Sequence, residues 1–66
     1  MNLTVNGIPR TFPERMKLAE LMLRENAASR GSAAAVDGVV VPRGSWEAFL
    51  LADGSSVEIL TAVQGG

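Results

Sequence analysis

The sequence predicts a single α+β domain, in which one amphipathic helix packs across a mixed sheet of four or five short strands. Short apolar runs with strand character alternate with glycine-containing turns, and the segment 18–26 changes to a helical spacing. The length agrees, because 66 residues with 47% hydrophobic and 20% charged side chains suit one small globular unit. A chain of this size buries only about 60% of its unfolded surface, which leaves little room for a deep catalytic cleft.

The first two strands are predicted to form a hairpin. Residues 2–5 alternate polar and apolar side chains, as in a half-buried strand. The dipeptide Asn6-Gly7 follows directly and favours a type I′ turn, because both central residues of that turn need positive φ. Residues 8–12 are the expected return strand. Since Pro9 has no N–H to donate, we expect this strand at an edge of the sheet.

The helix is predicted by a change of period. Leu18, Leu21 and Met22 stand at i, i+3 and i+4, which places them on one apolar stripe. We expect the helix to start between residues 14 and 17 and to fade through 27–28.

The second half of the chain returns to the strand pattern. Residues 33–36 and 39–41 flank Asp37-Gly38, a second hairpin signal, and a third turn at 53–55 precedes the last strand, 57–63. The apolar positions of all these elements give the expected core: Leu3, Val5, Leu18, Leu21, Met22, Val36, Val39, Val57 and Ile59.

The last strand carries the candidate docking residues. If Val57, Ile59 and Thr61 face the core, the intervening Glu58, Leu60 and Ala62 point outward. Exposed apolar side chains at Leu60 and Ala62 would mark a surface for a partner protein. The alternative is that a local twist or bulge turns Leu60 inward, and the sequence leaves both open.

The chain ends in Val63-Gln64-Gly65-Gly66, which we interpret as a thin arm. Two glycines adopt backbone angles that are closed to other residues. Four extended residues reach roughly 13 Å at about 3.3 Å each. We therefore predict a folded domain over 1–62 and a flexible tail over 63–66 that can present the terminal carboxylate to another protein. Taken alone, the same ending also suits a frayed terminus.

Composition argues against catalysis within this chain. There is no cysteine and no histidine, so the sequence lacks a thiol nucleophile and the commonest acid–base group at neutral pH. No cluster of His, Cys, Asp and Glu has metal-ligand spacing, and we expect neither a metal nor a bound cofactor. The net charge of −1 without a basic cluster argues against nucleic acid. The apolar runs are too short for a membrane span, so we expect a cytoplasmic protein.

Two residues near the middle of the chain have open roles. Trp46 is expected as a core or rim anchor rather than a direct partner contact, because burial usually decides where a tryptophan lies. Arg43 suits either an acidic partner or a local carbonyl. Ser45 is a candidate cap for one helical turn over 46–49.

Two stretches and the tail together resemble a known family. Residues 36–46 read VDGVVVPRGSW, similar to the Asn/Asp-Gly-x-x-Val-Pro-Arg-x-x-Trp stretch of the ThiS family, the sulfur carriers of thiamin biosynthesis. Residues 51–59 read LADGSSVEI and resemble that family's Leu-x-Asp-Gly-Asp-x-Val-Glu-Ile segment, and the Gly-Gly ending resembles its tail. Two positions depart from the pattern: Ser55 replaces the second Asp, and Lys17 stands where a Thr commonly caps the helix.

The resemblance implies a ubiquitin-like β-grasp fold with the first and last strands side by side. It also implies that a ThiF/E1-like adenylyltransferase would activate the Gly66 carboxylate with ATP. A cysteine desulfurase would then supply the sulfur for a Gly66 thiocarboxylate, and the thiazole synthase ThiG would accept it. In this scheme Gln64 and Gly65 complete the arm, and the partners hold the catalytic groups.

Three alternatives stay open at this point. A MoaD-like carrier for molybdopterin synthesis has the same chemistry with another acceptor, although the Val-Pro-Arg-x-x-Trp stretch argues against it. A ubiquitin-like modifier would instead be joined through Gly66 to lysines of target proteins. A plain interaction domain would carry an inert tail.

Overall fold

The computed structural model describes residues 1–28 and 31–61. Its elements, in chain order, are β1 (Asn2–Val5), β2 (Ile8–Thr11), α1 (Leu18–Arg24), β3 (Ala33–Val36), β4 (Val39–Val41), the 3-10 helix η1 (Arg43–Ala48) and β5 (Ser56–Leu60).

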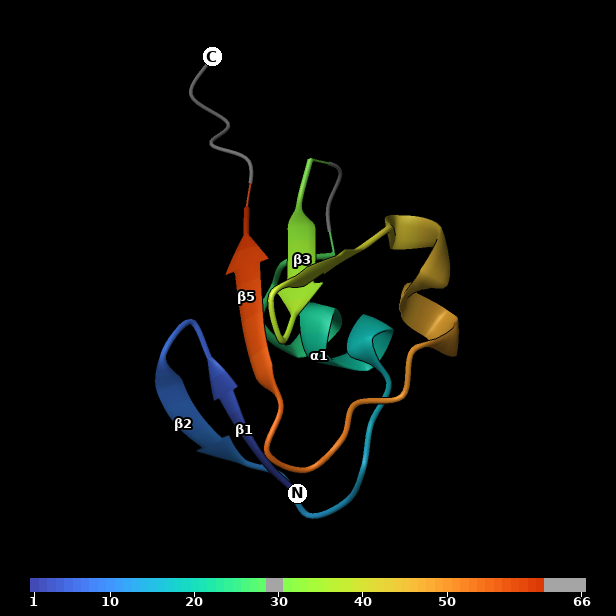
Figure 1. The fold of residues 1–66 in the computed structure, drawn as a ribbon. Coiled ribbons are helices and arrows are strands. Elements are labelled where there is room, and N and C mark those ends of the chain that lie inside the picture. The colour runs from blue at the N-terminus through green and yellow to red at the C-terminus, as the bar shows by residue number, and fades with distance from the viewer. Residues whose placement is uncertain (29–30, 62–66) are drawn as a thin grey trace.

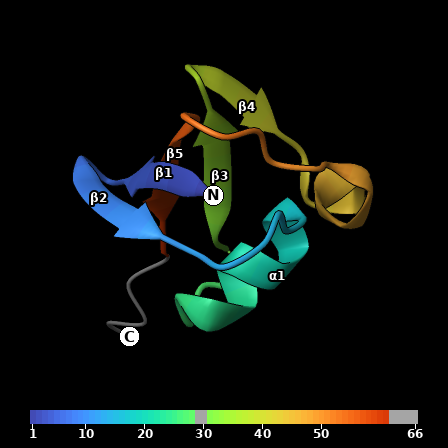
Figure 2. The ribbon, with the colours of Figure 1, turned by 90° about the horizontal axis from the view of Figure 1, so that it is seen from below.

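The strands form one mixed sheet in the order β2-β1-β5-β3-β4 (Figure 1). β1 and β5 run parallel in the interior, and the remaining neighbours are antiparallel. The helix α1 covers one face of the sheet, and η1 lies beside it (Figures 1 and 2). A helix on a five-stranded sheet whose first and last strands are neighbours is the ubiquitin-like β-grasp arrangement. The predicted fold class is confirmed.

Both predicted hairpins are present, and both turns have positive φ at their two central residues. Asn6 and Gly7 have φ of 52° and 81°, and Asp37 and Gly38 have φ of 50° and 83°. Asparagine, aspartate and glycine tolerate this region best, which is why the dipeptides predicted the turns correctly. β2 is an edge strand, as the proline at position 9 predicted.

The core contains eight of the nine expected residues, together with aromatic and aliphatic side chains from the loops. The fully buried side chains include Leu18, Leu21, Met22, Leu51 and Val57. The prediction for Val39 is wrong, because this side chain is 67% exposed. Val39 directly follows the turn glycine Gly38 on the outermost strand, where it has a strand neighbour on one side only. Its neighbour across the hairpin, Val36, is 6% exposed.

The helix is shorter than predicted at both ends. It begins at Leu18, with Lys17 as an N-cap residue that makes no side-chain capping bond. It ends at Arg24, and Asn26 has φ of 58°, which interrupts the helical backbone before the expected end.

The turn near Trp46 begins earlier than predicted, and Ser45 is not its cap. The 3-10 helix η1 starts at Arg43 with Pro42 at the N-cap position, where its φ of −60° suits the entry into a helix. Trp46 is 5% exposed, and its Nε1 donates a hydrogen bond to the Val41 carbonyl at 2.9 Å. The tryptophan is therefore a core anchor, as predicted, and it holds η1 against the end of β4.

Candidate functional site

The predicted arm lies outside the described residues. This applies to Ala62, Gln64, Gly65 and Gly66, so the boundary at 62/63 and the role of the carboxylate stay predictions. The part of the candidate site that the structure describes is β5, the strand that leads to the arm.

β5 alternates buried and exposed side chains along its length. Val57 is fully buried and Ile59 is 8% exposed, whereas Leu60 is 72% exposed. The register with β3 pairs Ala35 with Glu58 and extends from Val57 to Leu60. Of the two readings of Leu60, the outward one is therefore observed, and its role in docking stays a prediction.

One end of the strand differs from expectation. Thr61 was expected on the core side, but it is exposed. It follows Leu60, the last residue of β5, so the alternation of the strand no longer determines which side it faces.

Leu60 belongs to an apolar surface on the face of the sheet opposite α1. We call this surface the outer patch and define it by Ala33, Ala35, Val40, Leu60 and Glu58. These residues line a small pocket of about 130 Å³, in which Glu58 supplies the charge. Val40, which is 70% exposed, lies on β4, and Leu60 lies on β5, with β3 between these two strands. The outer patch therefore spans three strands.

The sequence pattern indicated only part of the outer patch. Ala33, Ala35 and Val40 were missed because their face depends on how β3 pairs with its neighbours. The register Ala33↔Leu60 and Ala35↔Val40 brings them together. The available signal was the run of three valines at 39–41, which places one valine on the face opposite its two neighbours.

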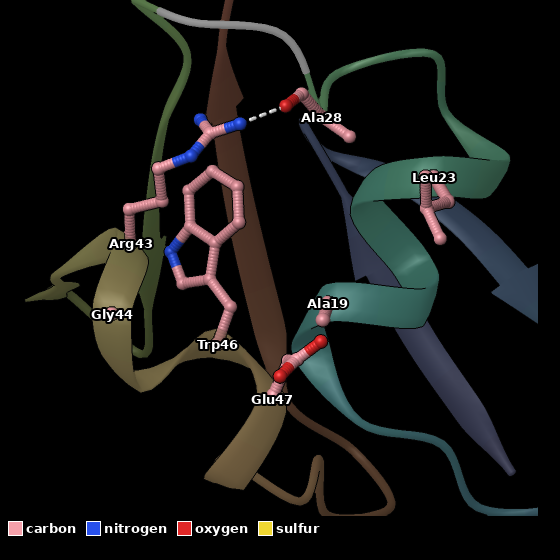
Figure 3. Close-up of a pocket in the computed structure, with 7 residues that line it drawn as sticks. All are labelled: Ala19, Leu23, Ala28, Arg43, Gly44, Trp46 and Glu47. Carbon is pink, nitrogen blue, oxygen red and sulfur yellow. Dashed lines mark hydrogen bonds between the residues drawn. The ribbon is translucent and has the colours of Figure 1, made fainter.

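A second pocket, of about 330 Å³, lies between α1 and η1 on the helix side of the sheet (Figure 3). α1 contributes Ala19 and Leu23, and η1 contributes four residues including Trp46 and Glu47. The Arg43 guanidinium lies over the Trp46 ring, 4.9 Å from its centroid, and donates to the Ala28 carbonyl.

The contact with Ala28 settles one open question from the sequence. Of the two roles considered for Arg43, the structure shows the bond to a local carbonyl. It fastens η1 to the chain just after α1. The pocket walls are thus part of the scaffold that holds the helix layer together.

The described residues hold no group of three or more His, Cys, Asp or Glu side chains that would bind a metal ion. Across residues 1–28 and 31–61, no helix is long and apolar enough to cross a membrane. The surface feature that these residues do present is the apolar outer patch, which includes the last residue of β5.

The sheet order, the helix α1 on one face and the exposed face of β5 define a small protein of the ubiquitin-like β-grasp class. The chain belongs to the ThiS family, whose model matches residues 3–66.

Solved structures agree with this assignment. The chain is similar to the crystal structure of the thiamine biosynthesis protein ThiS from Geobacter metallireducens, with 35% identity, a TM-score of 0.81 and complete coverage of both chains. It is also similar to the solution NMR structure of a thiamine biosynthesis protein from the same organism, with 35% identity and a TM-score of 0.84. That match covers 100% of this chain and 88% of the other. No curated protein sequence matches this chain.

Membership of the ThiS family supports a sulfur carrier in thiamin biosynthesis. The resemblance to the ThiS family is confirmed. A family of small carriers also agrees with the absence of cysteine and histidine from the sequence.

Proposed function

We propose that this protein carries sulfur as a thiocarboxylate on Gly66 and delivers it for thiazole formation. The observation that supports this most is the family match, which spans the fold and runs through Gly66 itself. The sequence has no thiol of its own, so the carried sulfur needs another attachment point, and the terminal carboxylate is the one that the family offers.

The proposed cycle begins with activation of the carboxylate. A ThiF/E1-like adenylyltransferase uses ATP to join AMP to the Gly66 carboxylate and releases pyrophosphate. The terminal sulfur of a persulfide, supplied by a cysteine desulfurase, then displaces AMP. Cleavage of the resulting acyl disulfide by a thiol leaves the thiocarboxylate, and the thiazole synthase ThiG accepts its sulfur.

The residues of this chain contribute position rather than catalysis. The arm, with Gln64 and Gly65, brings the carboxylate into a narrow active site of each partner. The outer patch is the proposed docking surface, with Leu60 as its most exposed large apolar side chain. Glu58 and Ala62 are the other two docking residues that we propose, from the alternation predicted for the last strand. We place this cycle in the cytoplasm.

The experiment that tests this function is an intact-mass measurement. The chain is incubated with the adenylyltransferase, ATP, a cysteine desulfurase and cysteine. A carrier gains the mass difference between one sulfur and one oxygen. A ubiquitin-like modifier would instead appear in larger covalent adducts with target proteins, and an interaction domain with an inert tail would keep its mass.

A second measurement separates the two carrier functions. The charged protein is offered to a thiazole synthase and, in parallel, to a molybdopterin synthase large subunit. We expect sulfur transfer only in the first reaction, since the family match is to ThiS. Transfer only in the second would assign the chain to molybdopterin synthesis.

A further inference from the structure

Side chains from the two hairpin turns hold β5 from both flanks. The Ile59 N–H donates a hydrogen bond to Asn6 Oδ1 at 2.8 Å. The Ser56 N–H donates to Asp37 Oδ1 at 2.9 Å. Asn6 and Asp37 are each the first central residue of a type I′ turn, with φ of 52° and 50°. The two turns therefore make the same kind of bond to opposite edges of one strand.

The two bonds differ in where they act along β5. Asp37 binds the first residue of the strand, Ser56. Asn6 binds Ile59, one residue before the strand ends at Leu60. The chain then continues through Thr61 toward the terminal glycine. Asn6 is thus the turn residue at the exit of the strand, and Asp37 is its counterpart at the entry.

The bond from Asn6 extends the pairing of β5 beyond the reach of β1. β1 pairs with β5 at Thr4↔Ser56 and Val5↔Val57, and the Asn6 N–H then donates to the Val57 carbonyl at 2.9 Å. The Asn6 side chain supplies the following acceptor, at Ile59. The side-chain oxygen of Asn6 thereby accepts the hydrogen bond that a backbone carbonyl of a longer β1 would accept from Ile59.

Turn geometry alone does not require this side chain. Glycine adopts positive φ more easily than asparagine, so the hairpin would tolerate glycine at position 6. The distinguishing contribution of asparagine is its carbonyl oxygen, which binds a residue 53 positions away. Because the Ile59 N–H is so distant in sequence, this hydrogen bond is a tertiary contact and is not needed to form the turn.

We infer that Asn6 is a positioning residue for the Gly66 carboxylate: its bond to the Ile59 N–H sets the direction in which the chain leaves β5 toward the partner's active site. This inference rests on the proposed function. Without the bond, the chain after Ile59 adopts more conformations, and the partner must select the productive conformation on binding. That selection lowers the apparent affinity without changing the chemical step.

The test compares Asn6→Gly with Asp37→Gly. Both variants keep a residue suited to the turn, and both remove one side-chain bond to β5. Pyrophosphate release by the adenylyltransferase is measured against carrier concentration to separate KM from kcat. Losing one hydrogen bond of preorganisation predicts a KM about three- to tenfold higher for Asn6→Gly, with kcat unchanged. Asp37→Gly stays within about twofold of wild type.

Conservative replacement and hydrogen exchange complete the design. Asn6→Asp keeps an acceptor and is expected to restore KM. Amide exchange of the folded proteins reports the lost bonds directly, at Ile59 in Asn6→Gly and at Ser56 in Asp37→Gly. If Asn6→Gly does not fold, a synthetic chain with an ester in place of the Ile59 N–H removes the donor and leaves the turn intact. The same rise in KM is expected for it.

The outcomes separate the two proposals. Equal KM values for wild type, Asn6→Gly and the ester chain would overturn the positioning role, as would an equal rise in Asn6→Gly and Asp37→Gly. In those cases wild type still releases pyrophosphate, so the proposed function stands. If wild type itself releases none, the proposed function fails.

Discussion

The two hairpins share one design at their turns and differ at their outer edges. In each, a side chain from the turn binds a backbone N–H of β5. At the outer edge of the first hairpin, Pro9 lacks a donor and Arg10 makes two hydrogen bonds to Glu25, both at 2.9 Å. At the outer edge of the second, Val39 and Val40 are 67% and 70% exposed.

The two edges of the sheet therefore differ in how well they are protected against contact with another chain. Proline and paired charges at an edge discourage another chain from adding a strand there. An edge with exposed valines lacks that protection, and here it adjoins the outer patch with its exposed Leu60. The proposed docking surface therefore lies on the half of the sheet formed by β3, β4 and β5, and β1 and β2 form the other half.

The largest effect is expected at the anchor of the second hairpin. Trp46→Ala removes a 5% exposed side chain and its bond to the Val41 carbonyl. We expect the free energy of unfolding to fall by about 3–5 kcal/mol, measured by urea denaturation followed by circular dichroism. Trp46→Phe is the control, and it should cost about 1–3 kcal/mol because it leaves the buried carbonyl unpaired. A loss below about 1 kcal/mol for Trp46→Ala would show that Trp46 is not an anchor.

The next effect concerns binding rather than folding. Leu60→Glu places a charge in the outer patch and is expected to weaken binding of the adenylyltransferase about tenfold. Its free energy of unfolding should change by less than about 0.5 kcal/mol, because Leu60 is 72% exposed. Ile8→Glu, at a 63% exposed position on the first hairpin, is the matched control. Equal weakening by both variants, in calorimetric titrations, would contradict a docking surface confined to the second hairpin and β5.

A smaller effect is expected at the charged edge of the first hairpin. Arg10→Gln breaks the ion pair in which the Arg10 side chain is 40% exposed and the Glu25 side chain is 21% exposed. We expect the free energy of unfolding to fall by about 0.5–1 kcal/mol. Arg24→Gln is the control, since its pair with Glu20 is 51% exposed on both sides and is worth about 0.3–0.5 kcal/mol. Both losses should shrink in high salt. Losses that are independent of salt in urea denaturation would show that the two arginines act mainly through other contacts, such as those with the Phe12 ring.

The smallest effect is expected at Val39. Val39→Thr should change the free energy of unfolding by less than about 0.5 kcal/mol, because the side chain is largely in solvent. Val36→Thr, at the paired buried position, should cost about 1–3 kcal/mol for burying a hydroxyl. Similar losses in thermal and urea melts would mean that Val39 is part of the core after all.

The elements that the sequence predicted well are those with local causes. Asn6-Gly7 and Asp37-Gly38 require positive φ, so the dipeptides alone indicated both hairpins. Leu18 and its stripe carry a helical period that survives any tertiary arrangement. Trp46 is large and apolar enough that its burial followed from its type.

The features that were missed or wrong depend on partners far along the chain. Val39 has the composition of a core residue, but its place on an edge strand decides its exposure. The outward face of Leu60 follows from the pairing of β5 with β3. The bond from Asn6 to Ile59 joins residues 53 positions apart, and no local pattern indicates it. The Gly-Gly ending predicted an arm that presents the terminal carboxylate, and the resemblance implied its thiocarboxylate chemistry. Both stay predictions, because residues 62–66 lie outside the described structure.

The most direct test of the account is to locate the carried sulfur. Cleavage by trypsin after Arg43 releases the C-terminal peptide 44–66, because no Lys or Arg follows. After incubation with the adenylyltransferase, ATP and the sulfur source, tandem mass spectrometry of this peptide should place the sulfur-for-oxygen gain on Gly66. The gain should be absent from a chain with one residue appended after Gly66. Sulfur on any other residue, or an equal gain in the appended chain, would contradict the account.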